Sequence, residues 1–222
     1  MVTTPLNPPD ALLLLTRHCP YCPTVLQGLS ELVKAGRIGQ LQAVNIEVHP
    51  EIAEQYGARS VPWIRIGEFE LEGLHSPAEL AEWVQRAGSP HGLSDWFASL
   101  FREGKLARVI KSVRNNPAHL DALLQLAADP DTDLTVRIGV SAVLEDLQGS
   151  AMLQEKLPAL LELSRHRDPR IRADAAHFLA LTGLPQAIEQ LQTMTRDSEA
   201  SVREVAADEL EEAGSSPDNG AA

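Results

Sequence analysis

Residues 11–22 read ALLLLTRHCPYC, an apolar run followed by a pair of cysteines. The run Ala11–Leu15 contains no polar position, which is typical of a strand buried on both faces of a sheet. After the CxxC, apolar residues recur at helical spacing over 24–35, and Gly36 is placed to end a helix. The stretch therefore predicts a buried strand that leads into a helix, with Cys19 at the mouth of that helix.

The segment that follows predicts, in chain order, a strand, a short helix, two strands paired as a hairpin and a last helix. The complete order is βαβαββα, which favours a small mixed sheet with helices on both sides. The added elements are a strand over 44–48 (Val44, Ile46 and Val48), a short helix over 50–56, a hairpin of 63–66 and 69–71 around Gly67, and a helix that begins at the capping box Ser76-Pro77-Ala78-Glu79.

Beyond residue 93 the strand patterns disappear and a helical repeat begins, with periods of 35 and 31 residues. Its three copies are Val136-Arg137 after Asp133, Ile171-Arg172 after Asp168, and Val202-Arg203 after Asp197. Four and eight residues after each aliphatic residue stand further apolar residues of one helical face: Val140, Ala175 and Ala206, then Leu144, Leu179 and Leu210. Another apolar helix precedes each of these, so the unit is a helical hairpin. Hairpins that cannot bury their apolar faces alone are expected to stack into an α-solenoid.

The two patterns predict a two-domain protein, with an α/β domain followed by an all-α domain. The Gly-, Ser- and Pro-containing stretch between them reads as a linker, and the last residues have almost nothing to bury, which predicts disorder. The predicted divisions are an N-terminal extension over 1–10, the α/β domain over 11–88, the linker over 89–93, the helical domain over 94–213 and a disordered tail over 214–222.

Three aromatic residues, Trp96, Phe97 and Phe101, lie close together at the start of the helical domain. They belong to a degenerate helix pair that precedes the first clear repeat and is expected to cap the stack. Their helical spacing favours packing in a core. The alternative is that they join the two domains.

Composition excludes several classes of function. The 222 residues carry 19 Lys and Arg against 31 Asp and Glu, a net charge of −12, which is the wrong sign for binding nucleic acid. The longest apolar run has five residues, too few to cross a membrane. Residues 1–10 lack the basic and apolar regions of a secretory signal, so we expect a cytoplasmic protein.

The two cysteines of the chain both lie in the CxxC, which points to chemistry rather than to a structural disulfide framework. Unpaired N–H groups at the helix N-terminus favour a thiolate at Cys19, and Cys22 is near enough to form the disulfide. Zinc would need further ligands such as His18 and His75, and a shared iron–sulfur cluster is a second alternative. For the remaining histidines we expect solvated or capping roles: His49, His91, His119, His166 and His177.

Cys19-Pro20-Tyr21-Cys22 after a strand, with Ser60-Val61-Pro62 before a hairpin, resembles the thioredoxin superfamily, and the CPYC form resembles glutaredoxins and glutaredoxin-like protein disulfide oxidoreductases. The resemblance covers residues 11–87. It implies that Cys19 is the nucleophile and Cys22 the resolving cysteine, with no bound cofactor. It also implies a cis-proline at Pro62 facing the cysteines, with substrate contacts at Pro20, Tyr21, Val61 and Pro62. Of the Gly-Gly-acidic pattern of glutaredoxins, Glu72-Gly73-Leu74-His75 retains only Gly73.

The helical repeats resemble HEAT repeats of the short bacterial kind, through the Asp…Val-Arg…Ala pattern over about residues 117–213. That resemblance implies a module that recognises proteins. The recurrent Arg137, Arg172 and Arg203 are expected to form a ladder with the turn aspartates of neighbouring repeats. The alternative is that the three arginines bind a ligand.

Together these patterns predict a thiol–disulfide oxidoreductase that acts on protein substrates through Cys19 and Cys22. The HEAT repeats would hold the client protein, and a reductant system, either thioredoxin reductase or glutathione, would complete the cycle. Neither a nucleic acid nor a membrane is expected as a partner. The alternatives are a redox-sensitive protein-binding adaptor without turnover and a carrier of metal or of an iron–sulfur cluster.

Overall fold

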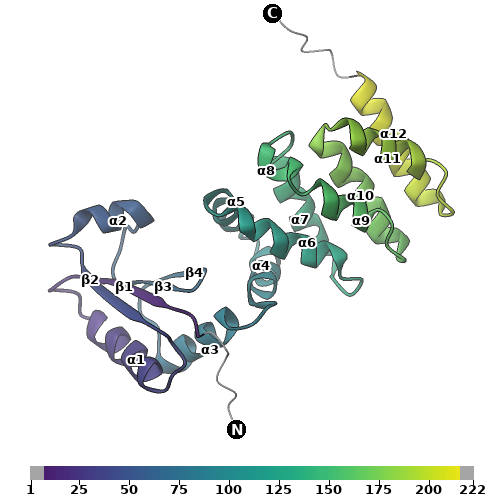
Figure 1. Cartoon of the computed structure of the whole chain (residues 1–222). Helices are drawn as coiled ribbons and strands as arrows, with labels where there is room; N and C mark the ends of the chain where they lie inside the picture. Colours follow the sequence, from purple (N-terminus) through teal and green to yellow (C-terminus); the bar gives the residue numbers. More distant parts are fainter. Residues whose placement is uncertain (1–7, 216–222) are drawn as a thin grey trace, which may run out of the picture. The chain divides into compact units, whose positions relative to one another are not determined.

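The computed structural model describes residues 8–215, and side chains up to residue 213. Its contacts divide the chain into two compact units, Met1–Asp95 and Trp96–Ala222, and each is described by itself (Figure 1). The predicted disordered tail, 214–222, lies outside the described residues except for 214 and 215, which end the last helix.

The first unit is built around a four-stranded mixed sheet with strand order β2-β1-β3-β4 (Figure 1). β1 pairs parallel with β2 and antiparallel with β3, and β3 pairs antiparallel with β4. The element order βαβαββα predicted from the sequence is confirmed. The elements are β1 (Ala11–Leu15), α1 (Cys22–Lys34), β2 (Leu41–Asn45), α2 (Pro50–Tyr56), β3 (Trp63–Ile66), β4 (Phe69–Glu72) and α3 (Pro77–Ala87).

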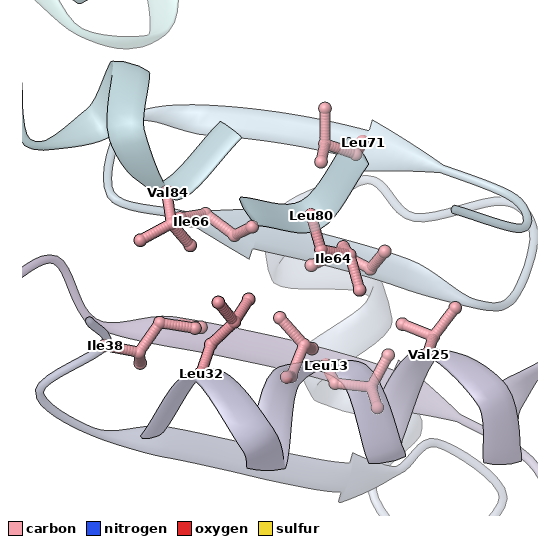
Figure 2. Close-up of a cluster of buried hydrophobic side chains, with 11 residues drawn as sticks. Leu13, Val25, Leu32, Ile38, Ile64, Ile66, Leu71, Leu80 and Val84 are labelled. Atoms are coloured by element: carbon pink, nitrogen blue, oxygen red, sulfur yellow. The ribbon is translucent and has the colours of Figure 1, made fainter. Parts of the chain in front are cut away.

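The sheet is covered on both faces, which explains why β1 has no polar position. Leu13 points into a core formed with α1 and α3, where Val25 and Leu80 are fully buried (Figure 2). Leu12 and Leu14 belong to a second core on the opposite face, where residues of α2 pack. Successive side chains of a strand point to opposite faces, so a strand between two cores must be apolar throughout.

The capping box at the start of α3 forms as predicted: Ser76 Oγ accepts from the N–H of Glu79, and the Glu79 carboxylate accepts from the N–H of Ser76. These bonds satisfy two backbone donors of the first turn. The hydrogen bond from the Ser76 N–H to its carboxylate lowers the pKa of Glu79.

The strand predicted over 44–48 is wrong in its bounds. β2 ends at Asn45, which is paired with the last residue of β1, Leu15. The chain then turns, because the carbonyl of Asn45 accepts from Val48 and His49, while its side chain accepts from the N–H of Glu47. Val48 is 67% exposed, so this apolar side chain does not pack in the core of the sheet.

The second unit is helical, and its three predicted repeats form three helix pairs: α6 with α7, α9 with α10, and α11 with α12 (Figure 1). The helices are α4 (Gly92–Arg102), whose residues 92–95 belong to the first unit, α5 (Leu106–Asn115), α6 (Leu120–Ala128), α7 (Leu134–Asp146), α8 (Ala151–Gln154), α9 (Leu157–Leu163), α10 (Pro169–Thr182), α11 (Pro185–Met194) and α12 (Ala200–Ser215), with a 3-10 turn at Pro117–His119 before α6. Helix α4 begins inside the segment predicted as a linker.

The repeat positions identified in the sequence are the buried face of each second helix. In α10, Ile171, Ala175 and Leu179 are at most 3% exposed. The equivalent residues of α7 and α12 are also buried, except that Leu210 near the end of α12 is half-buried. Alanine at the middle position of α10 and α12, Ala175 and Ala206, allows neighbouring helices to approach closely, as a stack of hairpins requires.

The three aromatic residues of α4 pack in a core, as their spacing predicts. Trp96, Phe97 and Phe101 are each at most 7% exposed. The guanidinium of Arg108 lies over the Trp96 ring, and the ring of His119 meets that of Phe97 edge-on.

Phe101 lies directly against the backbone of α7 at Gly139, where an added Cβ would come within 2.9 Å of its Cε1 atom and overlap the ring. We expect Gly139→Ala to destabilise the protein by about 1–3 kcal/mol through overpacking, although alanine ordinarily stabilises a helix relative to glycine. Urea unfolding followed by circular dichroism measures the loss. Thr135→Ala, at an exposed position of the same helix, is the matched control and should change stability by less than about 0.5 kcal/mol. A stabilising Gly139→Ala would contradict the packing.

Candidate redox site

The candidate site lies at the edge of the sheet where β1 ends. Leu14 of β1 is opposite Trp63, the first residue of β3, so the end of β1 and the start of β3 meet at this edge. The CxxC follows β1, and Val61 and Pro62 precede β3. The N–H of Gly73, just after β4, donates to the carbonyl of Pro62 over 2.9 Å, which ties a third loop to the same edge.

Cys19 and Cys22 form a disulfide. Cys22 is the first residue of α1 and is 3% exposed, whereas Cys19 lies before the helix and is half-buried. The N–H of Cys22 donates to Cys19 Sγ over 3.1 Å. An N–H donor at a helix N-terminus stabilises negative charge on that sulfur. The accessible Cys19 is therefore the sulfur that an external thiol or disulfide can reach.

The peptide bond between Val61 and Pro62 is cis, as the resemblance implies. Pro62 is buried and Val61 is half-buried. Pro20 is exposed, and Tyr21 is 53% exposed, so the two residues between the cysteines face solvent. The structure thus places all six predicted site residues at one edge of the sheet, five of them in two loops and Cys22 at the first position of α1.

In the first unit, no Asp, Glu, His, Lys or Arg among the described residues is buried. Among residues 8–215, no group of three or more His, Cys, Asp and Glu side chains is placed to hold a metal ion. The described part of the first unit thus offers no buried acid or base as a proton acceptor for Cys22.

Within the described part of the chain, no helix is both long and apolar enough to span a membrane.

Comparison with known protein families assigns both halves. Residues 11–85 match the thioredoxin domain family, and residues 120–211 match HEAT repeats. The chain joins a thioredoxin-like domain to HEAT repeats. A comparison with curated proteins found no match. We call residues 120–211 the HEAT array.

Of the three recurrent arginines of the HEAT array, Arg172 forms the predicted rung with a turn aspartate of the next repeat. Arg172 donates from Nε and Nη2 to the two carboxylate oxygens of Asp197, over 2.8 and 2.7 Å. Its Nη1 also donates to the carbonyls of His166 and Arg167, in the turn before α10. This rung is the predicted one, between an arginine and the turn aspartate of the next repeat.

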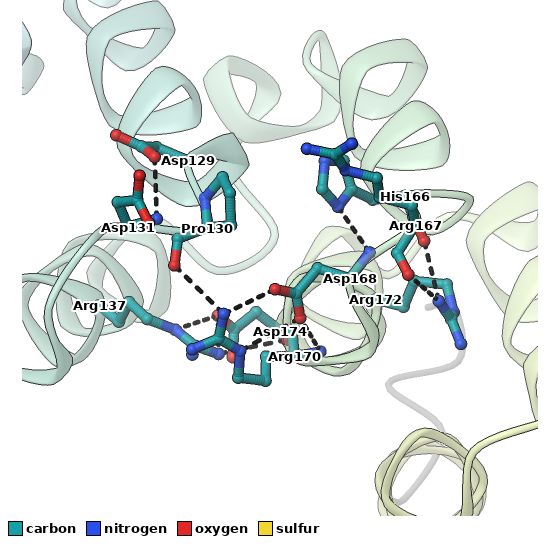
Figure 3. Close-up of polar contacts among 10 residues, drawn as sticks. All are labelled: Asp129, Pro130, Asp131, Arg137, His166, Arg167, Asp168, Arg170, Arg172 and Asp174. Atoms are coloured by element: carbon teal, nitrogen blue, oxygen red, sulfur yellow. Dashed lines mark hydrogen bonds and ion pairs between the residues drawn. The ribbon is translucent and has the colours of Figure 1, made fainter.

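Arg137 departs from the predicted pattern. It pairs with Asp174, at 2.6 Å, rather than with the turn aspartate Asp168 (Figure 3). The Asp168 carboxylate is bound instead by Arg170, whose hydrogen bonds hold the pKa of Asp168 at about 2. Arg203 donates to carbonyls of its own turn, at Asp197 and Ser198.

Two histidines have roles that the sequence did not suggest. His177 contacts Glu209 and Glu145, each 32 residues away, which is about one repeat in each direction. His119 is buried, with its Nδ1 atom 2.8 Å from Ser112 Oγ. The sequence did contain one signal for the contacts of His177: Glu145 and Glu209 are each separated from it by about one repeat period. His166 does cap a turn, because its Nδ1 atom accepts from the N–H of Asp168.

In the reduced protein we expect iodoacetamide to modify Cys19 before Cys22, because Cys22 is only 3% exposed whereas Cys19 is half-buried. Peptide mass spectrometry after limiting alkylation at pH 7 identifies the modified residue. In matched single-cysteine variants, Cys22→Ser should react about tenfold or more faster than Cys19→Ser, since the thiolate fraction changes about tenfold for each pKa unit. Equal rates would mean that the helix N-terminus does not distinguish the two sulfurs.

The ladder offers a matched pair of arginine substitutions. Arg172 and Asp197 have side chains only 12% and 13% exposed, so Arg172→Met leaves a largely shielded carboxylate without its guanidinium and should cost about 3 kcal/mol. Arg102→Met removes an ion pair with Asp133 in which the two side chains are 57% and 43% exposed, and should cost less than about 1 kcal/mol. Urea unfolding of the two variants measures the difference, and equal losses would contradict it.

Proposed function

We propose that the protein is a thiol–disulfide oxidoreductase of the glutaredoxin-like kind that uses the Cys19–Cys22 couple on protein substrates. The observation that carries the proposal is the unequal exposure of the two bonded cysteines at the start of α1. An accessible first cysteine and a buried second one suit a reaction in two steps, with attack from outside and resolution from inside.

In the reductive direction, the Cys19 thiolate attacks one sulfur of a client disulfide. The client disulfide breaks, a bond forms between Cys19 and the client, and one client thiolate leaves. Cys22 then attacks Cys19 Sγ as a thiolate, which forms the Cys19–Cys22 disulfide and releases the second client thiolate. The proton of Cys22 goes to a released client sulfur or to water. A reductant system, thioredoxin reductase or glutathione, returns the two electrons.

The loop of Val61 and Pro62 is proposed to hold an extended client segment through its backbone, next to Cys19. Pro20 and the exposed Tyr21 contribute further contacts from the CxxC side. The couple needs no bound cofactor.

We assign client recognition to the helical domain, over residues 94–213, and the chemistry to the domain over residues 11–88. HEAT arrays stack helices into extended surfaces suited to other proteins. The net charge of −12 disfavours nucleic acid as the partner, and we place the protein in the cytoplasm, where a reductant pool is present.

Insulin reduction tests the proposal, driven in parallel by dithiothreitol, by glutathione with its reductase, and by thioredoxin reductase. We expect turnover by the wild type with at least one donor and background rates for Cys19→Ser. Cys22→Ser should accumulate a mixed disulfide with its client, visible on a non-reducing gel and removed by dithiothreitol.

The alternative is a redox-sensitive adaptor without turnover. It predicts that no donor supports turnover although Cys19 and Cys22 oxidise and reduce reversibly, and that both single-cysteine variants retain the partner. Metal or iron–sulfur carriage predicts stoichiometric metal in protein purified without oxygen.

A further inference from the structure

Three consecutive second helices of the HEAT array meet at one histidine. His177, in the middle of α10, has Nδ1 2.6 Å from Glu209 Oε1 of α12 and Nε2 3.1 Å from Glu145 Oε1 of α7. Its side chain is 30% exposed and that of Glu209 is 17% exposed, so the shorter of the two contacts is largely shielded from water. A single ring thus bridges residues from three repeats.

The two contacts set the protonation state of the ring. An ionised carboxylate only accepts hydrogen bonds, and a neutral imidazole has one N–H to donate. Both nitrogens can donate only when the ring is the imidazolium. Loss of the proton leaves one nitrogen lone pair facing a carboxylate oxygen, and that contact becomes repulsive.

The other charged groups around α10 have partners elsewhere or are exposed. On α10 itself and on α7, Asp174 pairs with Arg137, and Asp146 of α7 pairs with Arg114. The charged residues of α6, α9 and α11, and the remaining acidic residues of α12, are exposed: Asp121, Glu162, Glu189, Glu204, Asp208, Glu211 and Glu212. Arg203 of α12 is bound to its own turn. The ion pairs of the His177 ring are those with Glu209 and Glu145.

We propose that His177 is a pH-sensitive clasp, which ties α10 to α7 and α12 as an imidazolium and releases them when it loses its proton. Helix α12 packs against α10 and α11 and is the last helix of the array. Release of the clasp removes the contact of Glu209 that ties α12 to α10, so we expect it to loosen α12.

The direction of the pH dependence follows from the same contacts. The hydrogen bond to Glu209, followed by the charge of Glu209 and the contacts of Glu145, raises the pKa of His177 above its ordinary 6.5, against an opposing effect of burial. The clasp therefore stabilises the array fully below the pKa of the unfolded chain. Its contribution is lost as pH rises through the higher pKa of the folded state.

Nuclear magnetic resonance of the full chain labelled with ¹⁵N-histidine tests the protonation state directly. At pH 6.5 we expect the His177 nitrogens to have the shifts of an imidazolium, and the titration midpoint to lie above 6.5. A neutral ring at pH 6.5, or a midpoint at or below it, would overturn the proposal. This readout needs no variant and does not depend on redox activity.

Hydrogen exchange by mass spectrometry then tests the mechanical consequence in the full chain. Between pH 6 and pH 9, after correction for intrinsic exchange, wild-type protection of residues 200–213 should fall. The opening constant of His177→Gln divided by that of the wild type should fall as the pH rises over this range. The total fall should be about tenfold for each unit by which the pKa of His177 in the folded protein exceeds 6.5. His91→Gln, at an exposed histidine, is the control and should follow the wild type. A His177→Gln profile with the wild-type pH dependence would refute the clasp.

Discussion

The thioredoxin-like domain depends on one constraint, the burial of β1 on both of its faces. Leu13 faces the core under α1 and α3, while Leu12 and Leu14 face the core under α2. A shift of one residue would exchange the two sets of side chains and misplace every contact, so the register of β1 is strongly held. Since β1 leads directly into the CxxC, the same packing positions Cys19.

Strand pairing carries that constraint to the other side of the site. β1 lies between β2 and β3 and is hydrogen-bonded to both, with its Leu14 opposite Trp63 of β3. The loop before β3, with its cis peptide bond at Pro62, therefore lies at the edge where β1 ends. The disulfide itself adds an asymmetry, because α1 begins at Cys22 and encloses that sulfur. The register of the strands thus sets the position of the two cysteines, and the start of α1 at Cys22 sets their unequal accessibility.

The HEAT array is held together by two kinds of contact with different requirements. Buried aliphatic and alanine residues pack the second helices, and any sequence that keeps their size and spacing can supply them. The polar contacts are more specific: Arg172 needs a carboxylate at Asp197, and His177 needs two carboxylates and a proton. The apolar face accounts for the stacking, and the polar contacts select which groups of neighbouring repeats pair.

The sequence by itself determined the order of the elements, the repeat and the CxxC-spaced pair of cysteines, because periodicity, caps and spacing are local properties. Only the tertiary structure decided the end of β2, the partner of Arg137 and the bridge at His177. Asn45 turns the chain because β1 has no further residue to pair with. Arg137 reaches Asp174 because Arg170 already binds Asp168. The pairings of Arg137 and His177 depend on which groups packing brings together across about one repeat, and no local pattern contains that information.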